Sequence, residues 1–327
     1  MRRAVERGPR SSAPPRDAPE MAGESNRIVE LAIAESRSAI YGGANMLPLQ
    51  LALVSEVKQV KPPELCRVSA ALQRQVARDF GPIWQINATV DAFITLEDVP
   101  IGYWPMIVET QLDTPGAAGI HLDKDGQPFS LIEYNDTWSL TASHECLEML
   151  ADPFGNRMAP GQSPKSNQGR VEFLVEVADP CEAAQFSYRV NGQMVSDFYT
   201  PSYFDPIKSS GTRYSFTGAV SGPRIVLEGG YISWHEPISD HWWQLFVVNG
   251  KKKYRDLGVF TAIRENLRAM TDSRTPFEEI APELKAGVPR ASAAFGELTA
   301  ALTAGDDAAA SKAKSLRAQI KALKAGK

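Results

Sequence analysis

The residues best suited to chemistry in this chain form one short run, Ser143-His144-Glu145-Cys146-Leu147-Glu148. On a helix, residues i and i+4 lie on the same face, so His144 and Glu148 could bind one metal ion side by side. The run has the form H-E-x-x-E, in which glutamate stands where the H-E-x-x-H motif has its second histidine. Glu145, one position further round the helix, would flank the ion and act as general base toward a water molecule.

A catalytic metal site needs at least a third protein ligand, and the acidic segment 176–182 can supply it. Glu176 is the first candidate and Asp179 is the second, either as a ligand or as a hydrogen-bond partner of His144. Asp152 either supports the site or only ends the helix. Because carboxylates make the set of ligands harder than two histidines would, we expect Zn²⁺, with Mn²⁺ and Fe²⁺ as alternatives.

A solvated helix face would explain the same spacing, since His–Glu pairs often lie on such faces. The flanks of the motif favour a site instead. Residues 140–143 and, apart from Glu148, residues 147–150 are apolar or small, which indicates a buried helix. Charged side chains inside a buried helix need partners, and a cation is a suitable one.

The elements that must position this helix come before it. Apolar runs and alternating patterns predict strands at 49–54, 84–90, 105–112, 118–122 and 128–134. A helix over 65–80 would begin after Pro62-Pro63 and stop at Gly81-Pro82. The turn at 123–126 would join the last two strands as a hairpin. A cap at 135–137 would then start the metal-site helix, which Asp152-Pro153 ends near Leu150.

The sequence after this helix predicts further β hairpins and then helices. Residues 171–178 alternate as a strand does, Asn191-Gly192 is a strong hairpin signal, and strand-like runs continue to Val248. Near Leu257 the pattern becomes helical. Two apolar stripes at three- and four-residue spacing then predict a C-terminal helical hairpin, which either docks on the body or mediates self-association.

These patterns predict an α+β protein in three parts: a disordered tail over residues 1–25, a metal-binding domain over 26–258 and a helical region over 259–327. The net charge of −4 argues against a nucleic-acid partner. No apolar stretch approaches the roughly 20 residues of a membrane span. Three scattered cysteines, and a tail without an apolar signal region, predict a soluble protein of the cytoplasm.

Five segments carry a resemblance to a known family: 75–84, 102–105, 141–153, 176–180 and 195–198. Through them, the chain from Leu72 to Phe204 resembles a family of mostly uncharacterised bacterial proteins with a zincin-like core of metallopeptidase type. The resemblance implies His144 and Glu148 as metal ligands, Glu145 as the base, and Glu176 or Asp179 as the third ligand. The chain is also similar to secreted metalloprotease-like proteins in which S-H-E-x-x-E-x-x-x-D-P is followed by G-E-I-x-D. Here valine replaces the glycine of that second segment.

Two functions follow as hypotheses. The first is a metal-dependent hydrolase, foremost a zinc peptidase, whose hairpin strand at 118–122 or 128–134 binds an extended peptide. The second is a catalytically inactive zincin-like protein that acts as a protein-binding or structural module. His121, His235 or His241 could stabilise an oxyanion, although each such histidine is more commonly structural.

Overall fold

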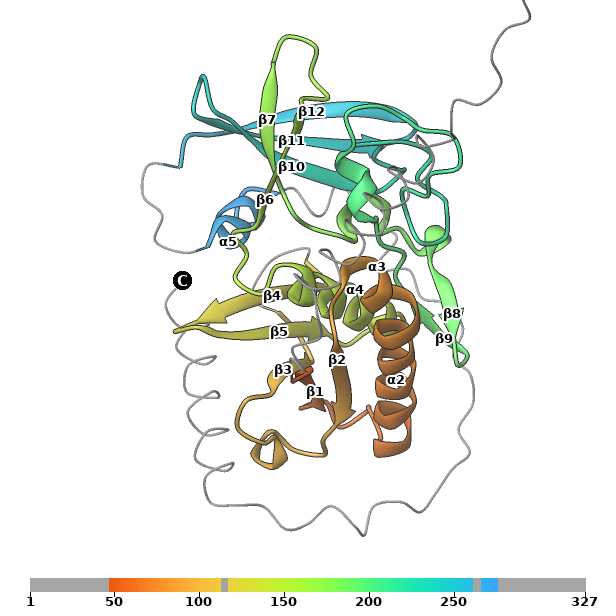
Figure 1. The fold of residues 1–327 in the computed structure, drawn as a ribbon. Helices are drawn as coiled ribbons and strands as arrows, with labels where there is room; N and C mark the ends of the chain where they lie inside the picture. Colours follow the sequence, from red (N-terminus) through yellow and green to blue (C-terminus); the bar gives the residue numbers. More distant parts are fainter. Residues whose placement is uncertain (1–46, 113–116, 261–265, 276–327) are drawn as a thin grey trace, which may run out of the picture. The chain divides into compact units, whose positions relative to one another are not determined.

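The computed structural model describes residues 47–112, 117–260 and 266–275 (Figure 1). The helices and strands named below all belong to the unit that begins at Pro48. The tail predicted at residues 1–25 and the helical hairpin predicted near the C-terminus lie outside the described residues.

The first sheet has the strand order β2-β1-β3-β5-β4. Its parallel strands are β1 (Leu49–Ser55), β2 (Ala88–Ala92), β3 (Trp104–Glu109) and β5 (Gln127–Glu133). The remaining strand, β4 (Gly119–Lys124), pairs with β5 in the antiparallel sense and forms an edge among the described strands. The interior strand β1 is apolar and buried from residue 51 to residue 54, because both faces of a parallel strand are covered.

The predicted hairpin between β4 and β5 is present. Its two turn residues, Asp125 and Gly126, have φ of +54° and +78°, as a two-residue turn of type I′ requires. The same device, with φ of +49° at Asn191 and +81° at Gly192, joins the short strands β8 (Tyr188–Val190) and β9 (Gln193–Val195).

The first helix does not stop at Gly81-Pro82, so that prediction is wrong. Helix α2 (Pro62–Arg74) runs into a π-helical segment, η1 (Gln75–Phe80), and then into α3 (Gly81–Trp84). Pro82 is tolerated because it lies in the first turn of α3, where a missing N–H costs little. A Cβ at position 81 would lie 2.5 Å from the carbonyl oxygen of Ile86, which explains the glycine. The strand predicted at 84–90 consequently begins later, at Ala88.

The helix that carries the motif is α4 (Trp138–Ala151), as predicted. It packs on β4, β5, β9 and α2, and twelve of its side chains are buried, so it is an interior helix and not a solvated one. Its N-terminus is stabilised by Asn135, whose Oδ1 accepts hydrogen bonds from the Thr137 backbone (2.8 Å) and hydroxyl (2.9 Å).

The second sheet is antiparallel, with the order β12-β11-β10-β7-β6. Its strands are β6 (Met158–Gln162), β7 (Arg170–Leu174), β10 (Tyr231–Glu236), β11 (His241–Val248) and β12 (Lys251–Gly258). The strand predicted at 171–178 therefore ends earlier, at Leu174, and the change to helix comes after β12. Helix α5 (Leu267–Asp272) follows. Short 3-10 turns lie at η2 (Leu96–Asp98), η3 (Asp179–Cys181), η4 (Ala184–Phe186) and η5 (Pro201–Phe204).

The architecture is mixed α/β, with several sheets and few helices, which is compatible with the predicted α+β class. One large apolar core includes residues of both five-stranded sheets, such as Leu53 of β1 and Trp234 of β10, together with Leu147 of α4. None of the helices in the described residues is long and apolar enough to cross a membrane.

Candidate metal centre

Three of the predicted site residues converge on one point. His144 Nε2 lies 3.2 Å from Glu148 Oε2 and 3.2 Å from Asp179 Oδ1. Glu148 and Asp179 are buried, whereas the side chain of His144 is 13% exposed. Metal–nitrogen and metal–oxygen bonds of about 2.0–2.2 Å require donor atoms roughly 3–4 Å apart. The three atoms therefore have the spacing of ligands to one ion.

Backbone contacts bring Asp179 to α4. Glu148 Oε1 accepts a hydrogen bond from the backbone N–H of Ala178 at 3.1 Å, which ties the start of η3 to the helix. On the other side, η3 passes close to Gly230, where a Cβ would lie 2.6 Å from the Asp179 carbonyl oxygen. Asp179 is thus placed by contacts between segments that lie far apart in the sequence.

The other candidate for the third ligand, Glu176, does not join this group. Its buried carboxylate contacts the guanidinium of Arg268. Of the two residues that the sequence left open, the structure therefore brings Asp179, and not Glu176, to His144 and Glu148.

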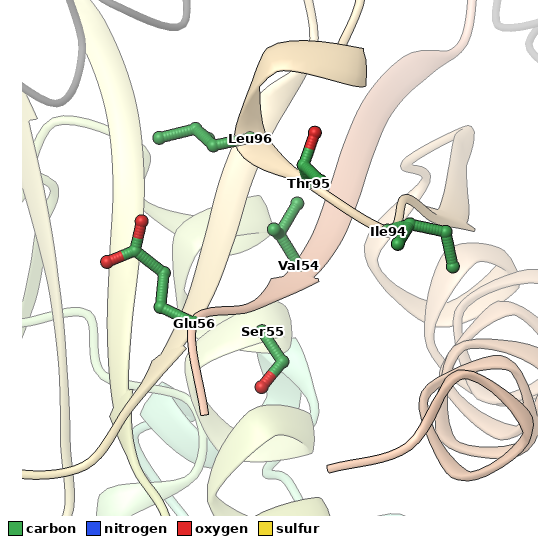
Figure 2. A pocket seen from close by; sticks show the side chains of 6 residues that line it. All are labelled: Val54, Ser55, Glu56, Ile94, Thr95 and Leu96. Carbon is green, nitrogen blue, oxygen red and sulfur yellow. The ribbon is translucent and has the colours of Figure 1, made fainter. Parts of the chain in front are cut away.

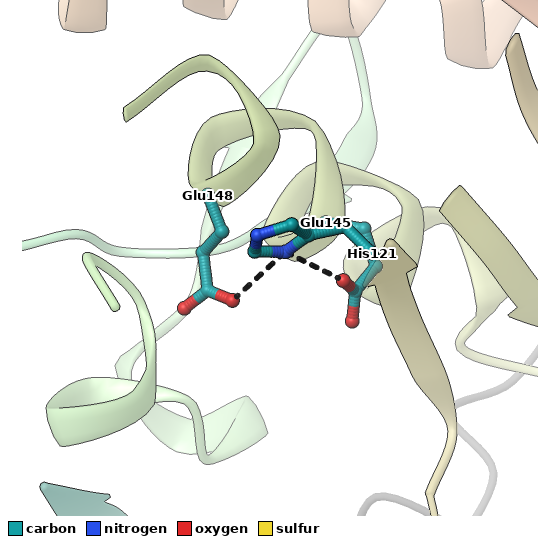
Figure 3. A group of neighbouring side chains, drawn as sticks. All are labelled: His121, Glu145 and Glu148. Atoms are coloured by element: carbon teal, nitrogen blue, oxygen red, sulfur yellow. Dashed lines mark ion pairs between the residues drawn. The ribbon is translucent and has the colours of Figure 1, made fainter. Parts of the chain in front are cut away.

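A second group shares Glu148 (Figure 3). His121, fully buried on β4, places Nδ1 3.6 Å from Glu145 Oε2 and 3.8 Å from Glu148 Oε2. Its Nε2 lies 3.1 Å from the carbonyl oxygen of Asp152. A carbonyl can only accept, so Nε2 carries a proton, and in the neutral ring Nδ1 presents its lone pair to the two carboxylates.

The other two candidate histidines lie elsewhere. His235 on β10 pairs with Asp240 at 2.8 Å, and His241 on β11 pairs with Asp256 at 2.9 Å. Both pairs are partly exposed, so they have the character of surface ion pairs. Among the three histidines weighed as oxyanion stabilisers, His121 is the one that faces the carboxylates of α4.

Arg268 is the residue that sequence reasoning missed. It comes from α5, is 3% exposed, and contacts both Glu148 and Glu176 through Nη1. Its Nη2 lies 3.7 Å from Glu145 Oε2, and its Nε lies 3.3 Å from Asp272 Oδ2. A buried acidic cluster predicts some cationic partner. No local pattern around position 268 identifies this arginine, which lies 120 residues from Glu148 in the sequence.

The buried side chains near α4 and Arg268 include more carboxylates than cationic groups. Five carboxylates are buried in this part of the described structure, those of Glu145, Glu148, Glu176, Asp179 and Glu182, and the first three of them lie beside the guanidinium of Arg268. Burial raises the pKa of Glu182 to about 8, against an opposing effect of His144. Burial and the charge of Glu148 likewise raise the pKa of Asp179 well above its ordinary value. Such a cluster takes up protons or binds a further cation.

The pKa values of His144 and Glu148 shift in the directions that favour their charged forms, because the two side chains face each other. Burial alone would lower the pKa of His144, but Glu148 and Asp179 outweigh it and raise that pKa well above its usual value. Burial alone would raise the pKa of Glu148, but His144 and Arg268 bring it well below its usual value. These shifts favour a charged pair between the imidazolium of His144 and the carboxylate of Glu148.

Three buried side-chain atoms of the two groups, each a possible metal ligand, make no hydrogen bond. In the residues that the structure describes, His121 Nδ1, Glu145 Oε2 and Asp179 Oδ1 have no hydrogen-bond partner. For Asp179 Oδ1 this holds even though His144 Nε2 is only 3.2 Å away, since that contact is not aligned as a hydrogen bond. Close but unbonded donors fit a cation between them, because buried polar atoms are rarely left unpaired.

Neighbouring residues hold α4 in place. The Ser143 hydroxyl donates to Gln75 Oε1 at 2.7 Å and accepts from the Ser196 backbone N–H at 2.8 Å. Asp152 ends the helix and accepts a hydrogen bond from the backbone N–H of Arg157 at 2.6 Å. Cys146 is fully buried, and burial raises the pKa of its thiol, so it is a core residue and not a nucleophile.

A separate cavity of about 510 Å³ lies at the ends of β1 and β2 (Figure 2). It is lined by Val54, Ser55, Glu56, Ile94, Thr95 and Leu96. None of the histidines or carboxylates of the metal centre belongs to this lining.

Comparison of the chain with protein-family models, with curated proteins and with solved structures finds no match.

Proposed function

We propose that this chain is a metal-dependent hydrolase of zincin-like type, with a peptide as the leading substrate class. His144, Glu148 and Asp179 would hold one divalent ion, foremost zinc. The observation that carries the proposal is the 3.2 Å spacing of their donor atoms around His144 Nε2, with Asp179 Oδ1 left unbonded. This is the donor set of the H-E-x-x-E motif completed by a distant carboxylate.

When bound, such an ion polarises a carbonyl group and lowers the pKa of water. Glu145 is placed to act as the general base. It lies next to His144 on α4, is buried, and keeps Oε2 free of hydrogen bonds within the described chain. Its carboxylate belongs to the group of His121 and Glu148 and not to the group of His144, Glu148 and Asp179, so it is not one of the three proposed ligands.

The edge strand β4 supports a peptide as substrate. It borders α4, carries His121 of the cluster, and has one side without a neighbouring strand among those described. An extended peptide can add to such an edge through backbone hydrogen bonds, which would place its carbonyl groups near α4.

Zinc content and peptide hydrolysis test the proposal together. We expect one zinc per chain in the wild type, loss of zinc in His144→Ala and Asp179→Asn, and zinc binding without hydrolysis in Glu145→Gln. Glu172→Gln is the matched control, because Glu172 is a half-exposed carboxylate on β7 that faces a histidine outside the centre. A wild type that binds no zinc would contradict the proposal.

One observation favours the inactive alternative. Arg268 already contacts Glu148 and Glu176, so part of the negative charge is neutralised without a metal ion. If this pairing is the whole purpose of the cluster, the chain binds no zinc and His144→Ala changes only its stability.

A further inference from the structure

The carboxylates of α4 face two cation positions, and Glu148 belongs to both. The first position lies among His144, Glu148 and Asp179. The second lies among His121, Glu145 and Glu148, whose donor atoms are within 4.8 Å of one another. Each set contains one imidazole nitrogen and two carboxylate oxygens, so both sets suit the same kind of divalent ion.

Arg268 lies against the second position. Its guanidinium contacts Glu148 Oε2 and lies 3.7 Å from Glu145 Oε2, and these are the two oxygens that face His121 Nδ1. The structure shows no contact between Arg268 and Asp179. The guanidinium therefore lies beside both carboxylates of the second set, whereas in the first set it contacts Glu148 alone.

The surroundings of His121 indicate a cation site at the second position. Its ring is fully buried, its Nε2 is fixed by the Asp152 carbonyl at 3.1 Å, and its Nδ1 has no hydrogen-bond partner in the described residues. A histidine whose second nitrogen donates to a backbone carbonyl is the usual arrangement of a metal ligand.

We propose that Arg268 takes the place of a second metal ion, so that the centre binds one divalent ion and not two. Without the guanidinium, His121, Glu145 and Glu148 would bind a second ion. In that state Glu145 would be a ligand, whereas beside Arg268 it stays available as a base. This consequence for Glu145 rests on the proposed function, but the change in ion number does not.

The placement of α5 makes Arg268 a fixed part of the centre. The backbone N–H of Arg268 donates to the carbonyl of Gly155 at 3.0 Å, and Asn266 caps the helix. Leu267 packs on the small apolar cluster that contains Trp242. These contacts anchor α5 on both sides of Arg268. The guanidinium therefore stays beside the carboxylates unless the residue itself is replaced.

Zinc titration of Arg268→Met tests the inference, with calorimetry for affinity and elemental analysis for stoichiometry. We expect one more equivalent of zinc than in the wild type, and loss of this extra equivalent in Arg268→Met/His121→Ala. Arg268→Lys should keep the wild-type number. Arg78→Met is the control, because it removes an arginine that pairs with Asp79 outside the centre.

The outcomes separate this inference from the proposed function. No zinc in the wild type contradicts the proposed function, whereas no gain in Arg268→Met contradicts the role of Arg268. If Arg268→Met does not fold, Arg268→Met/Glu176→Gln removes the charge left unpaired and carries the same expectation. His121→Ala in the wild-type background gives an independent answer. We expect its zinc number to be unchanged, and a loss of zinc there would overturn the inference.

Discussion

Gly119 on β4 offers a direct test of how closely the edge strand packs on the candidate base. A Cβ at this position would lie 2.6 Å from Glu145 Oε1, 2.6 Å from Thr141 Cγ2 and 2.8 Å from Glu145 Cγ. Ordinary contact begins at 3.4 Å, so the Gly119→Ala side chain would force a displacement of about 0.8 Å. Both neighbours are buried, and overpacking of this kind costs about 1–3 kcal/mol.

Thermal unfolding in the absence of metal gives the first measurement. For a domain of this size, each kcal/mol lowers the melting temperature by about 2–4 °C. The second measurement is the zinc number, which should stay at the wild-type value because His144, Glu148 and Asp179 are not touched. Hydrolysis should fall, since Glu145 must move. Gly169→Ala is the control, because nothing lies within 4 Å of its added Cβ. An unchanged melting temperature in Gly119→Ala would refute the packing argument.

Three further predictions concern the metal ion and the support of α4. Zinc at about 100 times its dissociation constant should raise the free energy of unfolding by about 2.7 kcal/mol, a gain that a chelator or His144→Ala removes in a melting assay. Zinc affinity should rise with pH and binding should release protons, since Glu148 and Asp179 hold the pKa of His144 above its usual value against the effect of burial. Calorimetry in buffers of different ionisation enthalpy measures the protons released. An equal heat of binding in all buffers would contradict this prediction. Ser143→Ala should cost about 1–3 kcal/mol, measured by urea unfolding, because it leaves the buried Gln75 carbonyl oxygen and the Ser196 N–H without their partner. A loss below about 0.5 kcal/mol would contradict this role.

Local sequence determined the elements of the centre. The apolar flanks of the motif predicted a buried helix, and the helical period placed His144 and Glu148 on one face, 3.2 Å apart. Asn-Gly and Asp-Gly pairs predicted the two-residue hairpins, because only residues that tolerate positive φ fit them. These features depend on neighbours within a few residues, so the sequence alone is sufficient for them.

Contacts between distant segments could be decided only by the tertiary structure. The choice of Asp179 over Glu176 depends on the contact between η3 and α4. The direction in which the His121 side chain points depends on the pairing of β4 with β5. Helical structure runs through Gly81-Pro82 into α3, where the carbonyl oxygen of Ile86 leaves no room for a Cβ at position 81. Arg268 joins the carboxylates from 120 residues away. A buried charge must find its partner in space and not along the chain, so the sequence revealed the need for a cation but not which residue supplies it.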